Sequence, residues 1–355
     1  MYDVVVVGAG PIGSRTAELI AKNNFKTLIL EEHPEVGKPV HCAGLVSHRI
    51  FELSNASDNI IVNVTNKARF YSPNKKFIEL KSKKPVYVIS REKFDKELTE
   101  MAKNSGAEIK RFTRFENYKK KKDSLRIKSS NGSFETKLLI GADGPNSAVA
   151  KVAKLKPSKN ILTAVQSTIK YDFDPEVVEL WFGSKISPDF FGWVIPENEK
   201  WARVGLANSK NTLNCFKNFV KIRFDHEIKH RSSLAGMIRY GLIESSTSDR
   251  TILVGDAASQ VKPFSGGGLI YGLMGSEFAA EACVKSLEQK NYSKDFFKEN
   301  YDDAWKNKLA WPIKKGLAFS KLIHSLSDEQ LNFLFTSVEK SRLTRLMDSA
   351  DMDFL

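Results

Sequence analysis

Short apolar runs alternate with amphipathic stretches along the chain. The uninterrupted β-branched run at residues 4–7 is typical of a parallel strand buried on both faces. Residues 14–23 are expected to form a helix, and a second apolar run follows at 27–30. Buried runs of the same kind return at 137–140 and 251–254. The pattern predicts an α/β fold with a parallel sheet.

A pattern with a period of two lies between these runs. Residues 60–80 alternate in a way that indicates β-hairpins, and further strands are expected at 163–170, 177–182, 192–195 and 202–206. Sheet inserted between segments of a parallel α/β domain is typical of a second domain that faces the substrate. We expect a discontinuous nucleotide-binding domain at 1–60, 88–155 and 245–290, and an inserted β-sheet substrate domain at 61–87 and 156–244.

Helical spacing dominates several other segments. Ser90 is expected to cap a helix over 91–103. Ser47 is expected to cap a short helix that runs to residue 53. A longer helix is expected over 269–287. The stretch 291–355 is charged and amphipathic without a strand signal, so it predicts a helical C-terminal region.

The composition is that of an ordinary globular protein, with 41% hydrophobic and 27% charged residues among 355. No stretch has the apolar length of a membrane span, and a strand that begins at residue 2 leaves no room for a signal peptide, so a cytoplasmic protein is expected. The three cysteines, Cys42, Cys215 and Cys283, lack the spacing of metal ligands or of a disulfide framework. No metal site is therefore expected.

Basic residues, mostly lysines, outnumber acidic ones and give the chain a formal net charge of +13. This charge favours nucleic acid, anionic lipid surfaces or phosphorylated substrates as partners. No nucleic-acid-binding module accompanies it, and the cluster Lys119–Lys122 is expected on a solvated turn. Two interpretations stay open: a lysine-rich surface without a specific partner, and peripheral attraction to an anionic membrane, on the inner face of the cell membrane.

A glycine motif follows the first strand. Gly8, Gly10 and Gly13 form G-x-G-x-x-G between a strand and a helix, where backbone can approach a pyrophosphate closely and the helix N-terminus attracts the anion. The second strand ends at Glu31, followed by Glu32, about twenty residues beyond the loop, where a carboxylate can accept from ribose hydroxyls. The arrangement predicts a Rossmann-like site for an ADP-containing cofactor. A glycine-rich turn without a ligand would leave Glu31 unexplained.

Four motifs in order resemble the p-hydroxybenzoate-hydroxylase-type FAD superfamily, and they cover residues 2–287. They are the glycine motif with Glu31, the R-x-x-F-D-x-x-L pattern that starts at Arg91, Gly-Ala-Asp-Gly at 141–144, and Gly255-Asp256. The resemblance implies a Rossmann-like FAD-binding domain with FAD as cofactor. It also implies that Asp143 is structural and ties its loop to the next helix.

The same resemblance implies a role for individual residues. Arg91 would lie along the cofactor, the strand near 113–115 would offer backbone to the adenine side, and Asp256 would accept from a ribityl hydroxyl. Backbone amides of Gly266–Gly268 would hold the pyrimidine edge of the flavin, where negative charge gathers on reduction. The expected cofactor-binding residues are Gly8, Gly10, Gly13, Glu31, Glu32, Cys42, Ala43, Gly44, Arg91, Phe115, Asp256, Gly267, Gly268 and Leu269.

Within the superfamily, the loop at 37–47 is most similar to that of the archaeal geranylgeranyl reductases, the digeranylgeranylglycerophospholipid reductase-like proteins, which carry a cysteine near the flavin. Here that cysteine is Cys42. The stretch 191–196 is close to the family's aromatic-x-Trp-x-Phe-Pro signature, with Phe191 in place of the usual tyrosine and Ile195 in place of phenylalanine. The substrate-binding residues implied are Phe191, Trp193 and Pro196.

The chemistry implied is hydrogenation of carbon–carbon double bonds in geranylgeranyl chains of archaeal-type ether lipids. Such an alkene is unactivated, so hydride and proton delivery must be coordinated in a dry cavity. Cys42 is the catalytic candidate, as an acid or a gate, with His41 beside it to tune it; the alternative for Cys42 is a small buried hydrophobe. The reductant would be external, either ferredoxin-like or NAD(P)H.

Several alternatives stay open. On the same fold an FAD-dependent monooxygenase could act on an apolar or aromatic substrate, and a non-catalytic prenyl-binding escort could share the architecture. Intact Glu31, Arg91 and Asp256 argue against the escort, which has no need of a complete flavin site. The stretch with Trp305, Trp311 and Phe319 would either cover the substrate cavity or face a membrane.

Overall fold

A computed structural model describes residues 1–224, 229–341, 353 and 354 of the chain. Its first sheet contains eight strands, and six of them follow in the spatial order β15-β16-β9-β1-β2-β6. The strand β1 lies in the middle, parallel to β2 on one side and to β9 on the other. The strands are β1 (Tyr2–Val7), β2 (Thr27–Leu30), β6 (Glu108–Lys110), β7 (Phe115–Lys120), β8 (Leu125–Ser129), β9 (Gly132–Gly141), β15 (Thr247–Ser248) and β16 (Thr251–Leu253).

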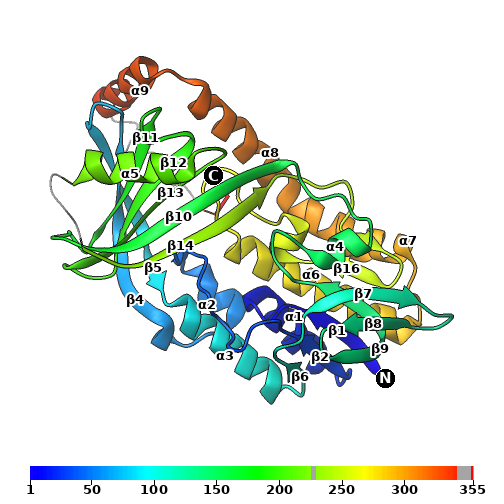
Figure 1. Ribbon diagram of the computed structural model, residues 1–355. Helices are drawn as coiled ribbons and strands as arrows, with labels where there is room; N and C mark the ends of the chain where they lie inside the picture. Colours follow the sequence, from blue (N-terminus) through cyan, green and yellow to red (C-terminus); the bar gives the residue numbers. More distant parts are fainter. Residues whose placement is uncertain (225–228, 342–352, 355) are drawn as a thin grey trace.

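The second sheet also has eight strands, in the order β14-β10-β13-β12-β11-β4-β5-β3. Its pairs are antiparallel except for β11 and β4, which run parallel. The two sheets lie at opposite ends of the molecule (Figure 1). The strands are β3 (Leu45–Ser47), β4 (Ile61–Tyr71), β5 (Phe77–Ile89), β10 (Asn160–Lys170), β11 (Val177–Gly183), β12 (Ser187–Pro196), β13 (Trp201–Asn208) and β14 (Lys229–Tyr240).

Helices cover the first sheet and connect it to the second. Helix α1 packs against α3 and α6, and α8 runs from the region of α6 toward α9, which lies at the far end of the second sheet (Figure 1). The helices are α1 (Pro11–Ala21), α2 (Arg49–Ser54), α3 (Arg91–Asn104), α4 (Ala148–Val152), α5 (Thr212–Arg223), α6 (Leu269–Gln289), α7 (Lys294–Phe297), α8 (Asp303–Ser325) and α9 (Asp328–Ser341). None of the helices in the described ranges is long and apolar enough to cross a membrane.

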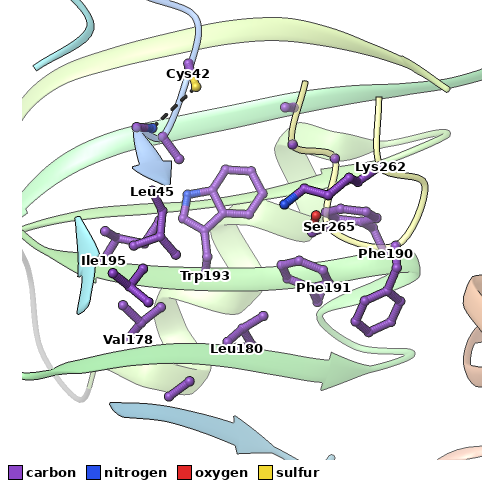
Figure 2. A pocket seen from close by; sticks show the side chains of 18 of the residues that line it. Cys42, Leu45, Val178, Leu180, Phe190, Phe191, Trp193, Ile195, Lys262 and Ser265 are labelled. Atoms are coloured by element: carbon purple, nitrogen blue, oxygen red, sulfur yellow. Dashed lines mark hydrogen bonds between the residues drawn. The ribbon is translucent and has the colours of Figure 1, made fainter. Parts of the chain in front are cut away.

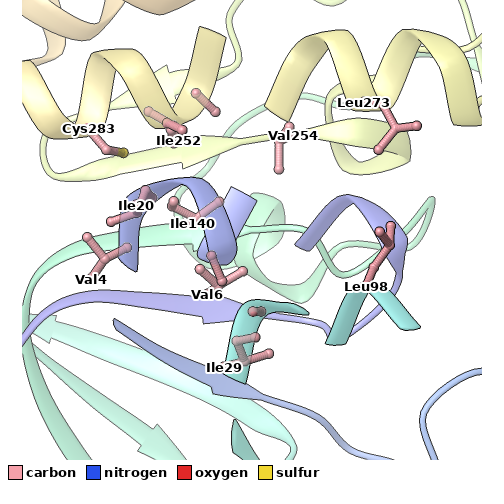
Figure 3. Close-up of a cluster of buried hydrophobic side chains, with 14 of the residues drawn as sticks. Val4, Val6, Ile20, Ile29, Leu98, Ile140, Ile252, Val254, Leu273 and Cys283 are labelled. Carbon is pink, nitrogen blue, oxygen red and sulfur yellow. The ribbon is translucent and has the colours of Figure 1, made fainter. Parts of the chain in front are cut away.

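The largest hydrophobic cluster lies between the first sheet and its helices. Val4, Val6, Ile29 and Ile140 are fully buried, and Figure 3 shows them facing the same interior as Cys283 of α6. This burial on the sheet faces explains why these strands read as continuous apolar runs rather than as alternating ones. Such packing fixes the carboxyl ends of β1 and β2, from which the glycine loop and Glu31 extend.

The structure confirms the α/β fold class, and most of the expected elements are present. Strand β2 has the predicted bounds, and the Ser90 hydroxyl caps α3 by accepting from the Lys93 N–H at 3.3 Å. The prediction that Ser47 caps a helix was wrong. Ser47 is the last residue of β3, and α2 has no side-chain cap. Lys119 and Lys120 end strand β7 rather than lying on the turn.

Helix α5 and strands β3, β14 and β15 were not predicted, and β3 lies where an irregular loop was expected. The C-terminal region is helical to Ser341. Most of the predicted region beyond that residue, 342–352 and 355, lies outside the described residues. The domain boundaries stay predictions, although β3 and the end of β5 belong to the second sheet.

Candidate cofactor and substrate site

The glycine loop shows which of its residues serve the fold and which face open space. Gly8 has φ +101°, and a Cβ there would lie 2.5 Å from the Ala142 carbonyl oxygen. A Cβ on Gly13 would lie 2.0 Å from the Gly8 carbonyl oxygen, so helix α1 can approach β1 only with glycine. Gly10 has no atom within 4 Å of its Cβ position. Its open side, at the uncapped N-terminus of α1, fits a pyrophosphate.

The carboxylate of Glu31 is held beside this loop. One oxygen accepts from the Ala9 N–H at 2.8 Å, and the other accepts from the backbone N–H of His33 at 2.9 Å and lies 2.7 Å from its Nδ1. Glu31 is buried, whereas Glu32 is exposed. The geometry presents Glu31, rather than Glu32, at the place expected for a ribose partner.

The expected adenine-side strand meets Glu31 through backbone. The Thr113 N–H donates to the Glu31 carbonyl oxygen at 2.8 Å. Phe115 pairs with Ser129 in the first sheet, and its side chain is buried in a second hydrophobic cluster that includes Val5 and Leu28. Thr113, within the predicted stretch 113–115, is therefore the residue that meets Glu31, and a contact from Phe115 to the cofactor stays a prediction.

Arg91 begins α3 and is held by its own helix. Its Nε and Nη2 donate to the two carboxylate oxygens of Asp95 at 3.0 and 2.9 Å. The Cys42 thiol also interacts with the guanidinium. Burial opposes the charged form, but Asp95 and Cys42 together raise the pKa of Arg91, so it is a permanent cation near Cys42.

Asp256 faces this cation from the far end of the sequence. Burial raises the pKa of Asp256 to about 6, and the charge of Arg91 opposes that rise. The described residues give its carboxylate no hydrogen bond, and a Cβ on Gly268 would lie 2.6 Å from its Oδ1. A part-buried carboxylate that lacks a donor fits the ribityl hydroxyl expected here.

Gly267 and Gly268 lead into Leu269, the first residue of α6. This helix has no side-chain cap and no acidic residue in its first turn. Its N-terminus therefore presents free N–H groups and the positive end of the helix dipole, as the pyrimidine edge of a reduced flavin requires. Together with Gly10, Glu31 and Asp256, these features fit FAD.

Asp143 has the structural role expected of it. Its carboxylate accepts from Ser147 Oγ at 2.6 Å and from the Val149 N–H at 3.0 Å, at the start of α4. Burial raises the pKa of Asp143 although these hydrogen bonds oppose the rise. The residue ties the loop after β9 to the following helix.

A cavity of about 380 Å³ lies between the Cys42 loop, the second sheet and the loop at 262–267. Its wall is mostly apolar, and Figure 2 shows the side chains that surround it. Cys42 belongs to the lining, and the Gly44 N–H donates to its sulfur at 3.4 Å. The apolar lining includes Leu45, Val178, Leu180, Phe190, Phe191, Trp193, Ile195 and Phe264.

The aromatic residues of β12 have fixed orientations. Trp193 Nε1 donates to Gln166 Oε1 at 3.0 Å, and Phe190 stacks on Phe191 with ring centroids 4.2 Å apart. Phe191 and Trp193 both line the cavity. Pro196 is buried at the end of β12 and does not belong to the lining; its carbonyl oxygen accepts from Asn63 Nδ2 at 3.0 Å.

His41 has an unexpected partner, and Lys262 and His324 were not predicted as site residues. His41 lines it, but its Nδ1 donates to the Ala235 carbonyl oxygen at 2.7 Å. Lys262 extends into the lining, and His324 packs on Phe190 with ring centroids 6.4 Å apart. The position of Lys262 next to the glycine-rich stretch 266–268 could have indicated that it belongs to the site. The sequence around His324 carries no such signal.

Chemically, the site combines residues that fit FAD with an apolar chamber whose lining includes the Cys42 thiol. The described residues contain no group of side chains that could hold a metal ion. The arrangement suits redox chemistry on an apolar molecule, with the Cys42 thiol at the junction of cradle and chamber.

Comparison with known proteins agrees with this site. Residues 1–276 match the family model described as FAD binding domain. A digeranylgeranylglycerophospholipid reductase of Methanosarcina acetivorans is 31% identical, over 98% of this chain and 91% of that protein. A geranylgeranyl bacteriochlorophyll reductase-like protein from Thermoplasma acidophilum superposes with a TM-score of 0.89 at 29% identity, covering 96% of this chain and 91% of that one.

A more distant likeness shows the fold alone. The p-nitrophenol 4-monooxygenase from Pseudomonas putida superposes with a TM-score of 0.78 at 18% identity, over 98% of this chain and 96% of that one. Proteins with different chemistry therefore share this architecture, and the fold does not distinguish a reductase from a monooxygenase.

Proposed function

Since the chain belongs to the family of FAD-binding flavoproteins that includes the digeranylgeranylglycerophospholipid reductases, we propose that it hydrogenates carbon–carbon double bonds of geranylgeranyl chains in archaeal-type membrane ether lipids. The observation that carries the proposal is the position of the apolar cavity. It begins at the expected flavin cradle, at Cys42 and Gly267, and extends along the aromatic residues of β12. An apolar chain threaded there would pass directly by the cofactor.

FAD, when bound and reduced, supplies a hydride donor. The chain's own part is to exclude water and to hold the alkene against the cradle, which the stacked Phe190–Phe191 pair and the hydrogen-bonded Trp193 do. We assign to the Cys42 thiol the delivery of the proton to the second alkene carbon. The Arg91 guanidinium lies beside the sulfur and faces the negative charge left after the proton has gone.

The test is anaerobic incubation of the dithionite-reduced holoprotein with geranylgeranylated glycerophospholipid, followed by mass spectrometry of the lipid. The expected result is a gain of two hydrogens for each double bond reduced. An unchanged lipid mass, with the flavin still reduced, would refute the proposal.

The same assay distinguishes the alternatives. A monooxygenase would require oxygen and NAD(P)H and would add oxygen to its substrate, and an escort would bind the lipid without altering it. The buried carboxylate of Asp256 beside Gly268 argues against an escort, because such a protein would not need a ribityl-binding group. An external reductant is also part of the proposal, and comparing a reduced ferredoxin with NADPH as the donor in the assay identifies its class.

We further propose that the protein associates peripherally with an anionic membrane through the outer side of α8. This side carries the exposed residues Lys308, Trp311, Lys315, Phe319 and Leu322, a spacing that places lysines beside apolar side chains. Lys314 and Lys321 add positive charge, and Asp303 is the one acidic residue of the helix.

The outer side of α8 lies next to the cavity. Phe319 packs on Phe264 with ring centroids 4.8 Å apart, and both Phe264 and Pro312 of α8 line the cavity. Trp305 is fully buried and points the other way, donating from Nε1 to Ser246 Oγ at 3.0 Å. A lipid leaving the bilayer beneath α8 would therefore have a short path to Trp193 and Cys42.

A further inference from the structure

The loop between η2 (Gly255–Ala258) and α6 places a lysine on the expected flavin cradle. The Lys262 N–H donates to the Gly267 carbonyl oxygen at 3.0 Å, and the Gly266 N–H donates back to the Lys262 carbonyl oxygen at 2.9 Å. A Cβ on Gly267 would lie 2.9 Å from Lys262 Cε and 3.5 Å from Nζ. The lysine side chain therefore lies close to the glycine backbone that we expect at the pyrimidine edge of the flavin.

A residue near the C-terminus holds this lysine. Lys262 Nζ donates to Asp353 Oδ1 at 3.0 Å, and Asp353 is completely buried. Its other carboxylate oxygen accepts from Ser47 Oγ at 2.6 Å and from Arg49 Nη1 at 2.9 Å. The donors thus come from the end of β3, the start of α2 and the loop before α6.

The backbone next to Asp353 is fixed as well. The Tyr271 hydroxyl of α6 donates to the Asp353 carbonyl oxygen at 2.8 Å, and Tyr271 itself lines the cavity. The ring of Phe354 lies under the Arg49 guanidinium at 5.3 Å. Burial would raise the pKa of Asp353, but Lys262, Ser47 and Arg49 together lower it, so the residue is an anion that binds two cations.

We propose that Asp353 is a positioning residue that holds Lys262 as a fixed positive charge at the pyrimidine edge of bound FAD, where it favours the reduced, negatively charged flavin. Among the described residues, Asp353 forms ion pairs with both Arg49 and Lys262. A nearby cation stabilises the reduced cofactor more than the oxidised one and so raises the reduction potential. The proposal rests on FAD binding and is independent of the lipid substrate.

The experiment measures the midpoint potential of the flavin in the purified holoprotein without lipid. In Lys262→Met, we expect reduced FAD to lose about tenfold in affinity relative to oxidised FAD, which lowers a two-electron potential by about 30 mV. Asp353→Asn should lower the potential in the same direction, because Lys262 loses its anchor. The double variant should match Lys262→Met, and Lys262→Arg should restore most of the potential.

A matched control is the ion pair between Lys306 Nζ and Asp302 Oδ2, which lie 2.6 Å apart. This aspartate is also buried, and neither residue lines the cavity. Lys306→Met should leave the potential unchanged. An unchanged potential in Lys262→Met would overturn the proposal. An unchanged or raised potential in Asp353→Asn would overturn the positioning role, since a rise is expected if Asp353 only masks the lysine charge.

Discussion

At the scale of single residues, two glycines of one motif have opposite surroundings. Gly13 has a backbone oxygen 2.0 Å from its Cβ position, whereas Gly10 has nothing within 4 Å. We expect Gly13→Ala to destabilise the apoprotein by about 3 kcal/mol or more, and Gly10→Ala to change its stability by no more than about 1 kcal/mol. Thermal unfolding of both apoproteins measures this difference.

FAD titration completes the comparison. Gly10→Ala should bind FAD at least tenfold more weakly, because its methyl group occupies the space left for the pyrophosphate. If Gly10→Ala bound FAD normally, the cofactor would have to lie elsewhere along the loop.

The raised pKa of Asp256 predicts a pH-dependent affinity for FAD. The apoprotein carboxyl has a pKa of about 6, and a ribityl hydroxyl that donates to it favours the ionised form. FAD binding should therefore release a proton, so affinity should rise with pH up to about 6 and level off above it. Isothermal titration at several pH values measures this, and Asp256→Asn should bind more weakly with a flat profile. A flat profile in the unaltered protein would contradict the assignment.

The thiol of Cys42 is predicted to act in the reaction rather than in cofactor binding. Cys42→Ala and Cys42→Ser should retain FAD and lose about 10²- to 10⁴-fold in the rate of prenyl reduction, the range typical of a lost general acid. Single-turnover kinetics with reduced holoprotein measures the rate. Cys215→Ala is the control, because that thiol lies on α5 outside the cavity lining. Full activity in both Cys42 variants would leave the residue a packing role.

At the scale of elements, the sequence predicted what is decided locally. Strand β2 is buried along its whole length, so its apolar run shows both of its ends, and Ser90 caps α3 through contacts within three residues. Ser47 carries the same type of signal, but its hydroxyl donates to Asp353, 306 residues away. Helix α5 buries Thr212, Phe216 and Phe219 at helical spacing, a local signal that the prediction missed.

In the candidate site, too, local features were predictable and contacts between distant segments were not. The motif residues Gly8, Glu31 and Asp256 were predictable because each stands at the end of a strand in a known order. The contact between Cys42 and Arg91, and the one between Lys262 and Asp353, join distant segments and have no local signature.

Helix α8 carries a histidine whose burial predicts an acid-sensitive stability. His324 packs on Phe182 and Phe190, and its buried Nε2 has no hydrogen-bond partner among the residues that the structure describes. Burial lowers the pKa of His324 to about 4. An unfolded histidine titrates at about 6.5, so the unfolded chain takes up the proton first as pH falls. The free energy of unfolding should therefore be unaffected above about pH 6.5 and fall by up to about 3 kcal/mol between pH 6.5 and 4.

Urea unfolding at several pH values tests this effect. His324→Phe should remove that part of the pH dependence while keeping the ring stack. An unchanged pH profile in His324→Phe would show that other groups account for the acid sensitivity.

At the scale of the whole molecule, the net charge of +13 and the exposed side of α8 predict binding to anionic vesicles. Sedimentation with vesicles containing anionic lipid should capture the protein at low salt, and several-fold less of it at high salt, because salt screens the lysines. Trp311 is 73% exposed, and Trp311→Ser combined with Phe319→Ser should weaken the binding further.

The control for vesicle binding is Leu213→Ser, which removes a largely exposed apolar side chain from α5. It should bind as the unaltered protein does. Equal capture by neutral vesicles, or equal loss in the control, would contradict a role for α8.

The parallel pair β4–β11 has a consequence for the synthesis of the protein. Ala68 of β4 lies opposite Val178 of β11, although more than a hundred residues separate them in the chain. At a translation rate of about 5–20 residues per second, β4 waits roughly 5–20 s on the ribosome before its neighbour emerges. During that interval the β4–β5 hairpin presents an unpaired edge, the kind of surface that associates with other nascent chains. Yield in a heterologous host should therefore depend on chaperones that shield this hairpin, and slower growth at low temperature should not by itself shorten the exposure.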